Sequence, residues 1–217
     1  SFNWTFTSGA AGDSAFDFLR EGETLTLTYT LTLTDNSAAT SPQASPSTTT
    51  TVAVTITGTN DTPFITNAPD TSALTETNAS ISDNGFFTVT DIDLTDTITA
   101  TVDSVAITGG SFNAAQVPLS SSELKAMLAL SVSSGSTSTI PANPTAGSNF
   151  TWTFTSGPST GGGNKAFEFL AAGETLELTY TVKTQDNSPT RTGKASDFAT
   201  STVTVTVTGT NDTPAIT

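Results

Sequence analysis

The chain contains a second, slightly altered copy of its own first part, and both copies close on the same residues, GTNDTP. Residues 51–63 read TVAVTITGTNDTP and residues 202–214 read TVTVTVTGTNDTP, an offset of 151 residues. Upstream, FNWTFTSG at residues 2–9 returns as FTWTFTSG at residues 150–157. A repeat of this length is typical of tandem domains and is too long for the units of a solenoid. We therefore expect a full repeat to be a domain with its own core.

The closing sequence also sets the expected domain boundaries. A strand that runs into Thr62-Pro63 loses a ladder donor at the proline, so pairing stops there. We expect residues 1–62 to be the C-terminal part of one β-sandwich repeat and residues 63–217 to be a complete repeat. The chain would then carry about one and a half units of a longer array.

Alternation of apolar and polar residues predicts long strands. In TLTLTYTLTLT, residues 24–34, leucine and tyrosine occupy one face and threonine the other, which is the period of a strand. Loops are expected where Gly, Ser, Pro and Asn are abundant, over residues 37–50, 131–148 and 156–164. Further strands are expected at residues 4–7, 52–56, 86–90, 97–107, 152–155 and 203–207. The pattern is that of an antiparallel β-sandwich.

One segment breaks this pattern. SSSELKAMLAL, residues 120–130, places Leu124, Met127 and Leu128 at helical spacing. Ser120 and Glu123 precede them with the spacing of a capping box. We expect one short helix inserted between the strands.

The composition excludes most enzymatic chemistry. The 217 residues include no cysteine and no histidine, which removes thiolate nucleophiles, Ser-His schemes and most zinc sites. Twenty acidic residues against six basic ones give a net charge of −14, so nucleic acid and anionic membrane surfaces would be repelled. No apolar run approaches the roughly 20 residues that span a bilayer. We expect a protein that is not an enzyme, binds cations, has no nucleic-acid partner and does not insert into a membrane.

Acidic and amide side chains gather in a few places in this weakly charged chain. Calcium in proteins takes about six to eight oxygen ligands from carboxylates, amides and carbonyls. Each of these residues taken alone is also an ordinary turn former. Taken together, the clusters predict a calcium site. They are Asp91, Asp93 and Asp96 in VTDIDLTDT, the pairs Asn60-Asp61 and Asn211-Asp212, Asp186 in YTVKTQDNS, and Glu76 in ALTETN.

The order of these motifs resembles the cadherin repeat. With its GTNDTP endings, the chain looks still more like the cadherin-like VCBS-type repeats of giant bacterial RTX adhesins. The resemblance implies an all-β fold of antiparallel immunoglobulin/cadherin-like β-sandwich repeats. It departs from the cadherin pattern at Gly58-Thr59, where a linker aspartate is expected. The motifs run in the order Glu76, Asp91-x-Asp93, Leu170 with Glu174, Tyr180-x-Val182 with Asp186, and Asn211-Asp212-x-Pro214.

The resemblance also implies where calcium would bind. At the junction of the two repeats its ligands would be Glu23, Asn60, Asp61, Asp91, Asp93 and Asp186. A second possible metal site would combine Glu76, Glu174, Asn211 and Asp212. Glu21 is expected to be solvated and receives no role.

The function that the resemblance implies is structural. We expect an extender module of a secreted bacterial surface adhesin, located outside the cell and at its surface. Calcium would stiffen the linkers between tandem sandwiches and so support cell adhesion or biofilm formation. The partners would be neighbouring repeats of the same chain and other copies of it.

Three other functions stay open. Unpaired strand edges in residues 1–66 could be completed by a neighbouring subunit of an extracellular filament or surface layer. The threonine row of residues 24–34 could bind glycan or ice, although the second copy places Glu177 and Lys183 in that row. Asp91 and Asp93 could act as the carboxylate pair of a hydrolase, although carboxylates one residue apart more often share a cation.

Overall fold

The computed structural model describes residues 2–9, 14–35, 47–132, 139–142, 147–157, 166–188 and 197–212. The chain divides into two compact units, residues 1–60 and residues 61–217. The division falls between Asn60 and Asp61, whereas the sequence placed a boundary after Thr62.

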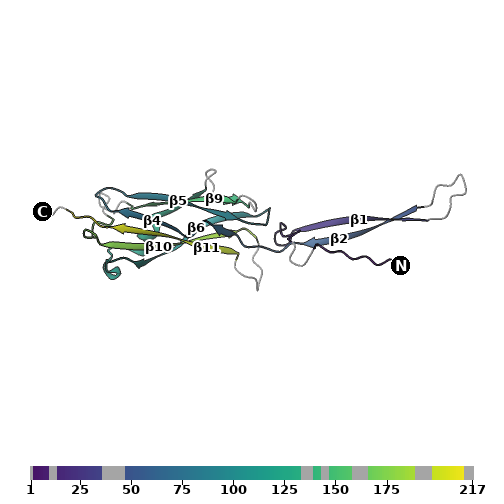
Figure 1. The fold of residues 1–217 in the computed structure, drawn as a ribbon, viewed down its shortest axis with the longest axis horizontal. Coiled ribbons are helices and arrows are strands. Elements are labelled where there is room, and N and C mark those ends of the chain that lie inside the picture. Colours follow the sequence, from purple (N-terminus) through teal and green to yellow (C-terminus); the bar gives the residue numbers. More distant parts are fainter. Residues whose placement is uncertain are drawn as a thin grey trace. The chain divides into compact units, whose positions relative to one another are not determined.

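The first unit is built on a long hairpin. Strands β1 (Thr24–Thr34) and β2 (Ser47–Thr57) pair antiparallel over their whole length (Figure 1). Because side chains alternate along a strand, the leucines of β1 share a face with the valines and isoleucine of β2, and threonines cover the opposite face. The loop expected over residues 37–50 is shorter than predicted, since β2 already begins at Ser47.

Residues 4–7 were expected to form a strand and do not. Their counterparts in the second copy lie in β9 (Ser148–Thr155), which pairs on one side with β5 (Ser82–Thr90) and on the other with β7 (Leu128–Val132). The sequence that forms β5 and β7 occurs once in this chain. The first copy of the β9 sequence therefore has no equivalent strands to pair with.

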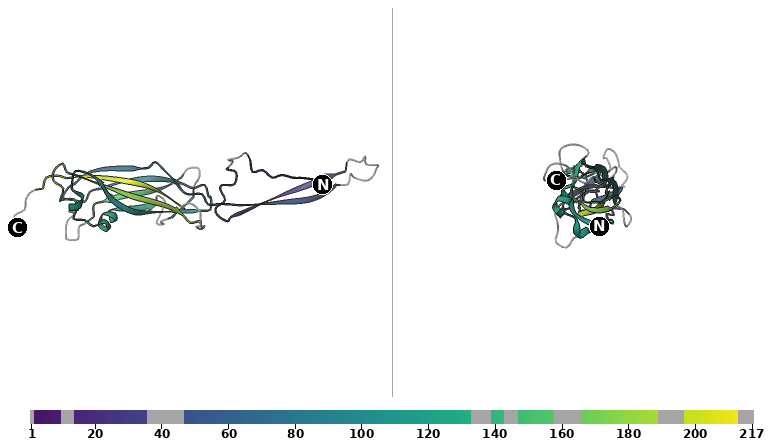
Figure 2. Two further views of the ribbon diagram at one scale, coloured as in Figure 1. Left: turned by 90° about the horizontal axis from the view of Figure 1, so that it is seen from below. Right: turned by 90° about the vertical axis from the view of Figure 1, so that its left-hand side faces the viewer.

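The second unit is a sandwich of two β-sheets (Figures 1 and 2). The first sheet has the order β4 (Asp70–Thr75), β11 (Phe198–Thr208), β10 (Thr175–Asp186), β6 (Thr97–Gly109) and β8 (Thr139–Pro141). The second sheet has the order β3 (Phe64–Thr66), β5, β9 and β7. The strands expected at residues 86–90, 97–107, 152–155 and 203–207 lie within β5, β6, β9 and β11. The all-β sandwich predicted from the sequence is confirmed.

One strand pair departs from antiparallel order. β4 runs parallel to β11, with Thr75 opposite Thr208, and all other strand pairs of the described residues are antiparallel. The segment that opens this unit is shared between the sheets, because β3 pairs with β5 and β4 pairs with β11. The parallel pairing brings the end of β4 beside the end of β11.

The core lies between the two sheets. Along β10 burial alternates with every residue, so that Leu178, Tyr180 and Val182 are fully buried. Phe87 and Trp152 of the facing sheet belong to the same cluster. Burying an aliphatic or Phe side chain of this kind stabilises the fold by roughly 1.5–3 kcal/mol. The inward side of each strand therefore supplies the stability that the threonine side cannot.

The predicted helix is present but shorter than expected. α1 (Ser121–Ala126) starts behind Ser120, whose hydroxyl accepts from Glu123 N while the Glu123 carboxylate accepts from Ser120 N. The helix does not reach residue 130, because Leu128 begins β7 and pairs with Phe154 of β9. Strand pairing buries Leu128, whereas a helix of this length has little stability of its own.

The connections hold two further short elements. A 3-10 turn, η1 (Ala114–Gln116), precedes α1, and β8 lies inside the stretch 131–148 that was expected to be a loop. Among the described residues, no helix is both long and apolar enough to cross a membrane.

Candidate metal centres

Carboxylates gather at the end of the second unit where β5 and β10 end and β6 begins. Asp91 follows β5, Asp96 precedes β6, and Asp186 is the last residue of β10. Because β6 and β10 are antiparallel neighbours, with Ile98 opposite Asp186, the start of one lies beside the end of the other. A carboxylate oxygen of each of the three aspartates lies within 4.8 Å of the others, and all three side chains are buried. Such a group could hold a metal ion.

Two further aspartates belong to the same end of the unit. Asp93 Oδ2 accepts a hydrogen bond from Asp61 N at 2.8 Å, and Asp93 N donates to Asp91 Oδ1 at 3.1 Å. The second of these bonds turns the backbone after β5 out of its extended path. We call the five residues the aspartate cluster: Asp61, Asp91, Asp93, Asp96 and Asp186.

Neighbouring polar groups hold the carboxylates in place. Ser188 donates from Oγ to Asp96 Oδ2 at 2.7 Å and from its backbone N to Asp186 Oδ1 at 2.9 Å. Asn187 Oδ1 accepts from Thr97 N at 2.8 Å, which ties the segment after β10 to the start of β6. These bonds fix the direction of the Asp96 and Asp186 carboxylates.

Two oxygens of the cluster are buried without a hydrogen-bond partner: Asp91 Oδ2 and Asp93 Oδ1. Asp91 exposes 2% of its surface and Asp93 exposes 0%. A buried polar atom left unpaired costs about 1–3 kcal/mol, and more when it carries charge. A cation held between these two oxygens would remove that cost.

Burial and repulsion between carboxylates also raise the pKa values of two residues in the cluster. Burial raises the pKa of Asp91 to about 7, and repulsion from neighbouring aspartates acts in the same direction, against the hydrogen bond from Asp93 N. Burial likewise raises the pKa of Asp93 to about 6, helped by repulsion from Asp61, Asp96 and Asp186. Near neutral pH the Asp91 carboxyl group therefore keeps part of its proton, and a cation bound there would displace that proton.

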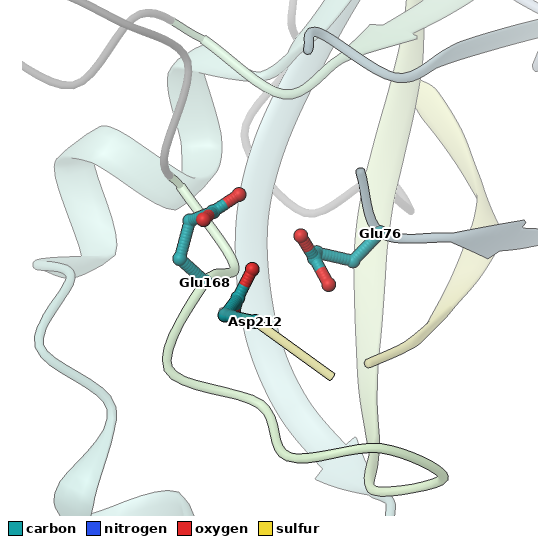
Figure 3. Close-up of side chains that lie close together, drawn as sticks. All are labelled: Glu76, Glu168 and Asp212. Atoms are coloured by element: carbon teal, nitrogen blue, oxygen red, sulfur yellow. The ribbon is translucent and has the colours of Figure 1, made fainter. Parts of the chain in front are cut away.

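A second group of carboxylates lies at the other end of β10, beside the end of β11. We call it the glutamate cluster: Glu76, Glu168 and Asp212. Glu76 follows β4, Glu168 lies in the turn that precedes β10, and Asp212 follows β11. Figure 3 shows the three carboxylates turned toward one another, and one oxygen of each lies within 4.8 Å of the others. This group too could hold a metal ion.

Glu76 is the buried member of the glutamate cluster, with 2% of its surface exposed. Its Oε2 accepts from Thr210 N at 2.9 Å and from Thr210 Oγ1 at 2.8 Å, whereas its Oε1 is buried without a partner. The Asn78 amide lies against the other two carboxylates. With its nitrogen turned inward it donates to Glu168 Oε2 at 3.1 Å and to Asp212 Oδ1 at 3.2 Å. With its oxygen turned inward it would offer a further ligand to a cation.

A glycine in the closing sequence sets the path of the chain after β11. Gly209 lies so close to the Leu170 carbonyl that a Cβ would collide with it, and its N–H donates to Glu174 O at 2.8 Å. Gly58 of the first copy is equally crowded and donates to Glu23 O at 2.8 Å. Glycine at this position is therefore a packing requirement in both copies.

The second metal site inferred from the sequence is assembled only in part. Glu76 and Asp212 lie together in the glutamate cluster. Glu174 makes a local bond instead, since its Oε2 accepts from Ala171 N at 2.8 Å. Asn211 is exposed, and its Nδ2 donates to Asp212 O at 3.3 Å.

Glu168 takes the third place in this cluster, and the sequence analysis did not select it. A signal was present, because AFDFL and AFEFL keep an acidic residue, Asp17 and Glu168, in both copies. An acid retained beside a repeated apolar motif could have been weighed with the others.

The residues of the first inferred site are divided between the two units. In the second unit the aspartate cluster contains Asp61, Asp91, Asp93 and Asp186 of that set, together with Asp96. Glu23 and Asn60 belong to the first unit.

In the first unit, the acidic residues before β1 have different surroundings. Glu23 Oε1 lies 3.7 Å from Arg20 Nε, and Asn60 N donates to Glu21 Oε2 at 3.3 Å. The expectation that Glu21 is solvated was wrong, because this residue is buried and its carboxylate accepts from the backbone that follows β2.

Both clusters offer oxygen donors, which suit hard cations such as calcium, magnesium and manganese. No protein-family model matches the chain, and no curated protein matches it at a significant level.

Proposed function

We propose that the chain is a structural extender module of a secreted bacterial surface adhesin, and that calcium bound by the aspartate cluster stabilises its sandwich repeat. Two features support the structural part of this proposal. The chain repeats a closing sequence at the end of a long strand in each copy, and the complete copy is an all-β sandwich. The resemblance of the motif order to cadherin-like VCBS-type repeats points to the same function.

The observation that carries the metal part is the pair of unpartnered, buried oxygens of Asp91 and Asp93. Ordinary turn-forming aspartates are solvated or satisfied by backbone N–H groups, so they need no further partner. These two carboxylates each keep one oxygen without a hydrogen bond while a third and a fourth acidic residue stand close by. A cation bound at the aspartate cluster would both satisfy these two oxygens and relieve the repulsion among the neighbouring carboxylates.

Calcium fits this site better than the other hard cations. It accepts about six to eight oxygens at flexible angles, whereas magnesium requires near-octahedral geometry and retains several waters. A group of buried carboxylates at strand ends, in a chain that has no imidazole or thiolate, suits the larger ion. Extracellular modules bind calcium with dissociation constants of roughly 10⁻⁴ to 10⁻³ M. Such a site would fill outside a cell and stay unfilled in the cytosol, so that folding would be completed after export.

The closing sequence gives calcium a mechanical role in the proposal. Asp61 of the first GTNDTP motif donates its backbone N–H to Asp93 of the aspartate cluster. An ion at the cluster would hold the linker residue and the strand ends in one coordination shell. We extend the proposal to the glutamate cluster, where Asp212 of the second GTNDTP motif meets Glu76. Each repeat would then have a cation at both ends, which stiffens a tandem array.

The metal part is tested by calorimetric titration of calcium into the full chain at neutral pH. We expect a dissociation constant of roughly 10⁻⁴ to 10⁻³ M, and we expect Asp91→Asn/Asp93→Asn to lose the binding event at the aspartate cluster. Asp103→Asn is the matched control, because Asp103 is exposed on β6 and lies outside both clusters. Wild-type binding by the double variant would remove the aspartate cluster from the proposal. The extender part is tested by small-angle scattering of a tandem of two complete repeats, which should become longer and stiffer in calcium than in chelator.

A further inference from the structure

Asn78 meets the glutamate cluster with an amide group that can serve the carboxylates in two opposite ways. One amide atom of Asn78 lies 3.1 Å from Glu168 Oε2, 3.3 Å from Glu168 Oε1 and 3.2 Å from Asp212 Oδ1. This position can be taken by Nδ2 or by Oδ1, because the amide can turn over about its last side-chain bond. The two orientations suit two different states of the cluster.

With Nδ2 in this position, the amide satisfies carboxylates in the absence of an ion. Its N–H groups donate to Glu168 and Asp212, and such charge-assisted bonds offset part of the repulsion between the two side chains. Glu76 is not served in this way, because its Oε1 is buried without a hydrogen-bond partner. The amide therefore compensates the cluster only in part.

With Oδ1 in this position, the distances are those between neighbouring ligands of calcium. Calcium binds oxygens at about 2.3–2.6 Å, so ligands separated by angles of about 72–90° lie roughly 2.7–3.7 Å apart. Magnesium binds at about 2.0–2.1 Å and right angles, which places neighbouring ligands about 2.8–3.0 Å apart. The distances from the Asn78 amide, 3.1, 3.2 and 3.3 Å, lie within the calcium range and exceed the magnesium range.

The cluster also has room for an ion. A cavity of about 300 Å³ has Glu76, Asn78, Thr210 and Asp212 in its lining. Glu76 exposes only 2% of its surface, so one member of this lining has a buried oxygen that lacks a partner. A cation bound here would satisfy this oxygen, which the Asn78 amide does not.

The backbone around Asn78 is held in place, so only the side chain has to move. Just before it, Glu76 N donates to Thr208 O at 2.8 Å. Thr77 Oγ1 accepts from Ala79 N at 3.2 Å and closes a turn around Asn78. A change of the atom presented to the cluster therefore needs one rotation of the amide and no rearrangement of the strands.

We propose that Asn78 is a ligand of the cation at the glutamate cluster and that its amide turns over on binding. In the metal-free chain Nδ2 donates to Glu168 and Asp212, and with calcium bound Oδ1 faces the ion beside their carboxylates. The added oxygen matters more to calcium, which takes about six to eight oxygens, than to magnesium, which retains several waters. Asn78 thus favours calcium over magnesium. This inference rests on the proposed cation at the glutamate cluster and does not involve the aspartate cluster.

The orientation of the amide is read by NMR of the full chain labelled with ¹⁵N, in chelator and in calcium. The side-chain signal of Asn78 is identified by its loss in Asn78→Ala. In chelator its N–H protons should exchange slowly with water, because carboxylates accept from them. In calcium the signal should shift and its protons should exchange faster, because they then face away from the carboxylates.

Titration of the full chain with calcium and with magnesium tests the ligand role. The event at the glutamate cluster is the one that Glu168→Gln weakens. Asn78→Ala should weaken calcium binding at this event by roughly tenfold, as expected for the loss of one ligand, and should weaken magnesium binding less. Asn78→Asp should bind calcium more tightly than the wild type, because it keeps the oxygen, adds a negative charge and removes the competing N–H groups. A merely structural amide would be harmed by both substitutions.

The matched control is Asn113→Asp, which adds the same charge outside both clusters. Asn113 caps η1, and its Oδ1 accepts from Ala115 N at 3.1 Å, a bond that aspartate can also make. This variant should bind calcium like the wild type.

Two results would overturn the inference and leave the proposed cation in place. The first is an unchanged Asn78 signal while the event at the glutamate cluster saturates. The second is weaker calcium binding in Asn78→Asp than in the wild type. A titration without any event that Glu168→Gln weakens would remove the cation of the glutamate cluster from the proposed function, and the ligand role of Asn78 with it.

Discussion

Calcium should raise the melting temperature of the second unit, and removing two charges from the aspartate cluster should abolish that rise. A site with a dissociation constant of about 10⁻⁴ to 10⁻³ M, in about 10 mM calcium, stabilises the folded form by roughly 1.4–2.7 kcal/mol. For a domain of this size about 1 kcal/mol moves the melting temperature by about 2–4 °C. The expected rise between excess chelator and calcium is therefore about 3–11 °C.

The melting temperature of the variant Asp91→Asn/Asp93→Asn should differ from that of the wild type in opposite directions in chelator and in calcium. In chelator it should melt at or above the wild-type temperature, because ionising these buried carboxyl groups is unfavourable and the variant no longer has to do so. In calcium it should melt below the wild type, because the ion has lost its central ligands. The assay is differential scanning calorimetry of the full chain, with Asp103→Asn as the control that keeps the wild-type response. If the variant kept the whole calcium-dependent rise, the assignment of the ion to this cluster would be refuted.

Four further predictions follow from the same structure. In chelator, the melting temperature of the second unit should fall as pH rises from about 4 to 7.5. The reason is that the pKa values of Asp91, about 7, and Asp93, about 6, in the folded state lie above those of the unfolded chain. Calcium should remove this fall. At about pH 6, calcium binding should release about one to two protons, measured by calorimetry in buffers of different ionisation enthalpy, and zero release would contradict the raised pKa values. Trp152→Ala should cost about 3–5 kcal/mol in denaturant unfolding of the second unit, whereas Trp4→Ala should change it by less than about 0.5 kcal/mol, and equal losses would contradict the burial difference between the copies. Glu168→Gln should weaken a second calcium-binding event in titration and leave the event at the aspartate cluster unchanged.

The strands were predictable because their signal is local. Alternation in residues 97–107 and 203–207 is present in the sequence itself, and β6 and β11 contain both runs. The helix end was not predictable in the same way. Leu128 fits helical spacing behind Leu124, but pairing with Phe154 of a strand far along the chain decides its conformation.

The acidic clusters also contain residues whose grouping the sequence could predict and residues whose grouping it could not. Asp91 and Asp93 are adjacent in sequence and directly follow a strand, so their grouping could be inferred from the chain alone. Asp96 and Asp186 meet because β6 and β10 are antiparallel neighbours, and this follows from topology and not from spacing.

Glu168 and Glu174 show that a resemblance in motif order does not decide which of two nearby acidic residues enters a cluster. Both precede β10, and the resemblance favoured Glu174. The turn uses the Glu174 carboxylate to accept from Ala171 N, and it leaves Glu168 to meet Glu76 and Asp212. Which of two nearby acids faces a cluster is decided by the turn geometry, which no periodicity encodes.

The central claim is that a calcium ion lies between the unpartnered oxygens of the aspartate cluster. A crystal structure of the full chain grown in calcium, with anomalous diffraction to identify the ion, tests it most directly. The account predicts an anomalous peak about 2.3–2.6 Å from both Asp91 Oδ2 and Asp93 Oδ1. A structure grown in the same calcium with no peak there, and with water or protons satisfying these two oxygens instead, would contradict it.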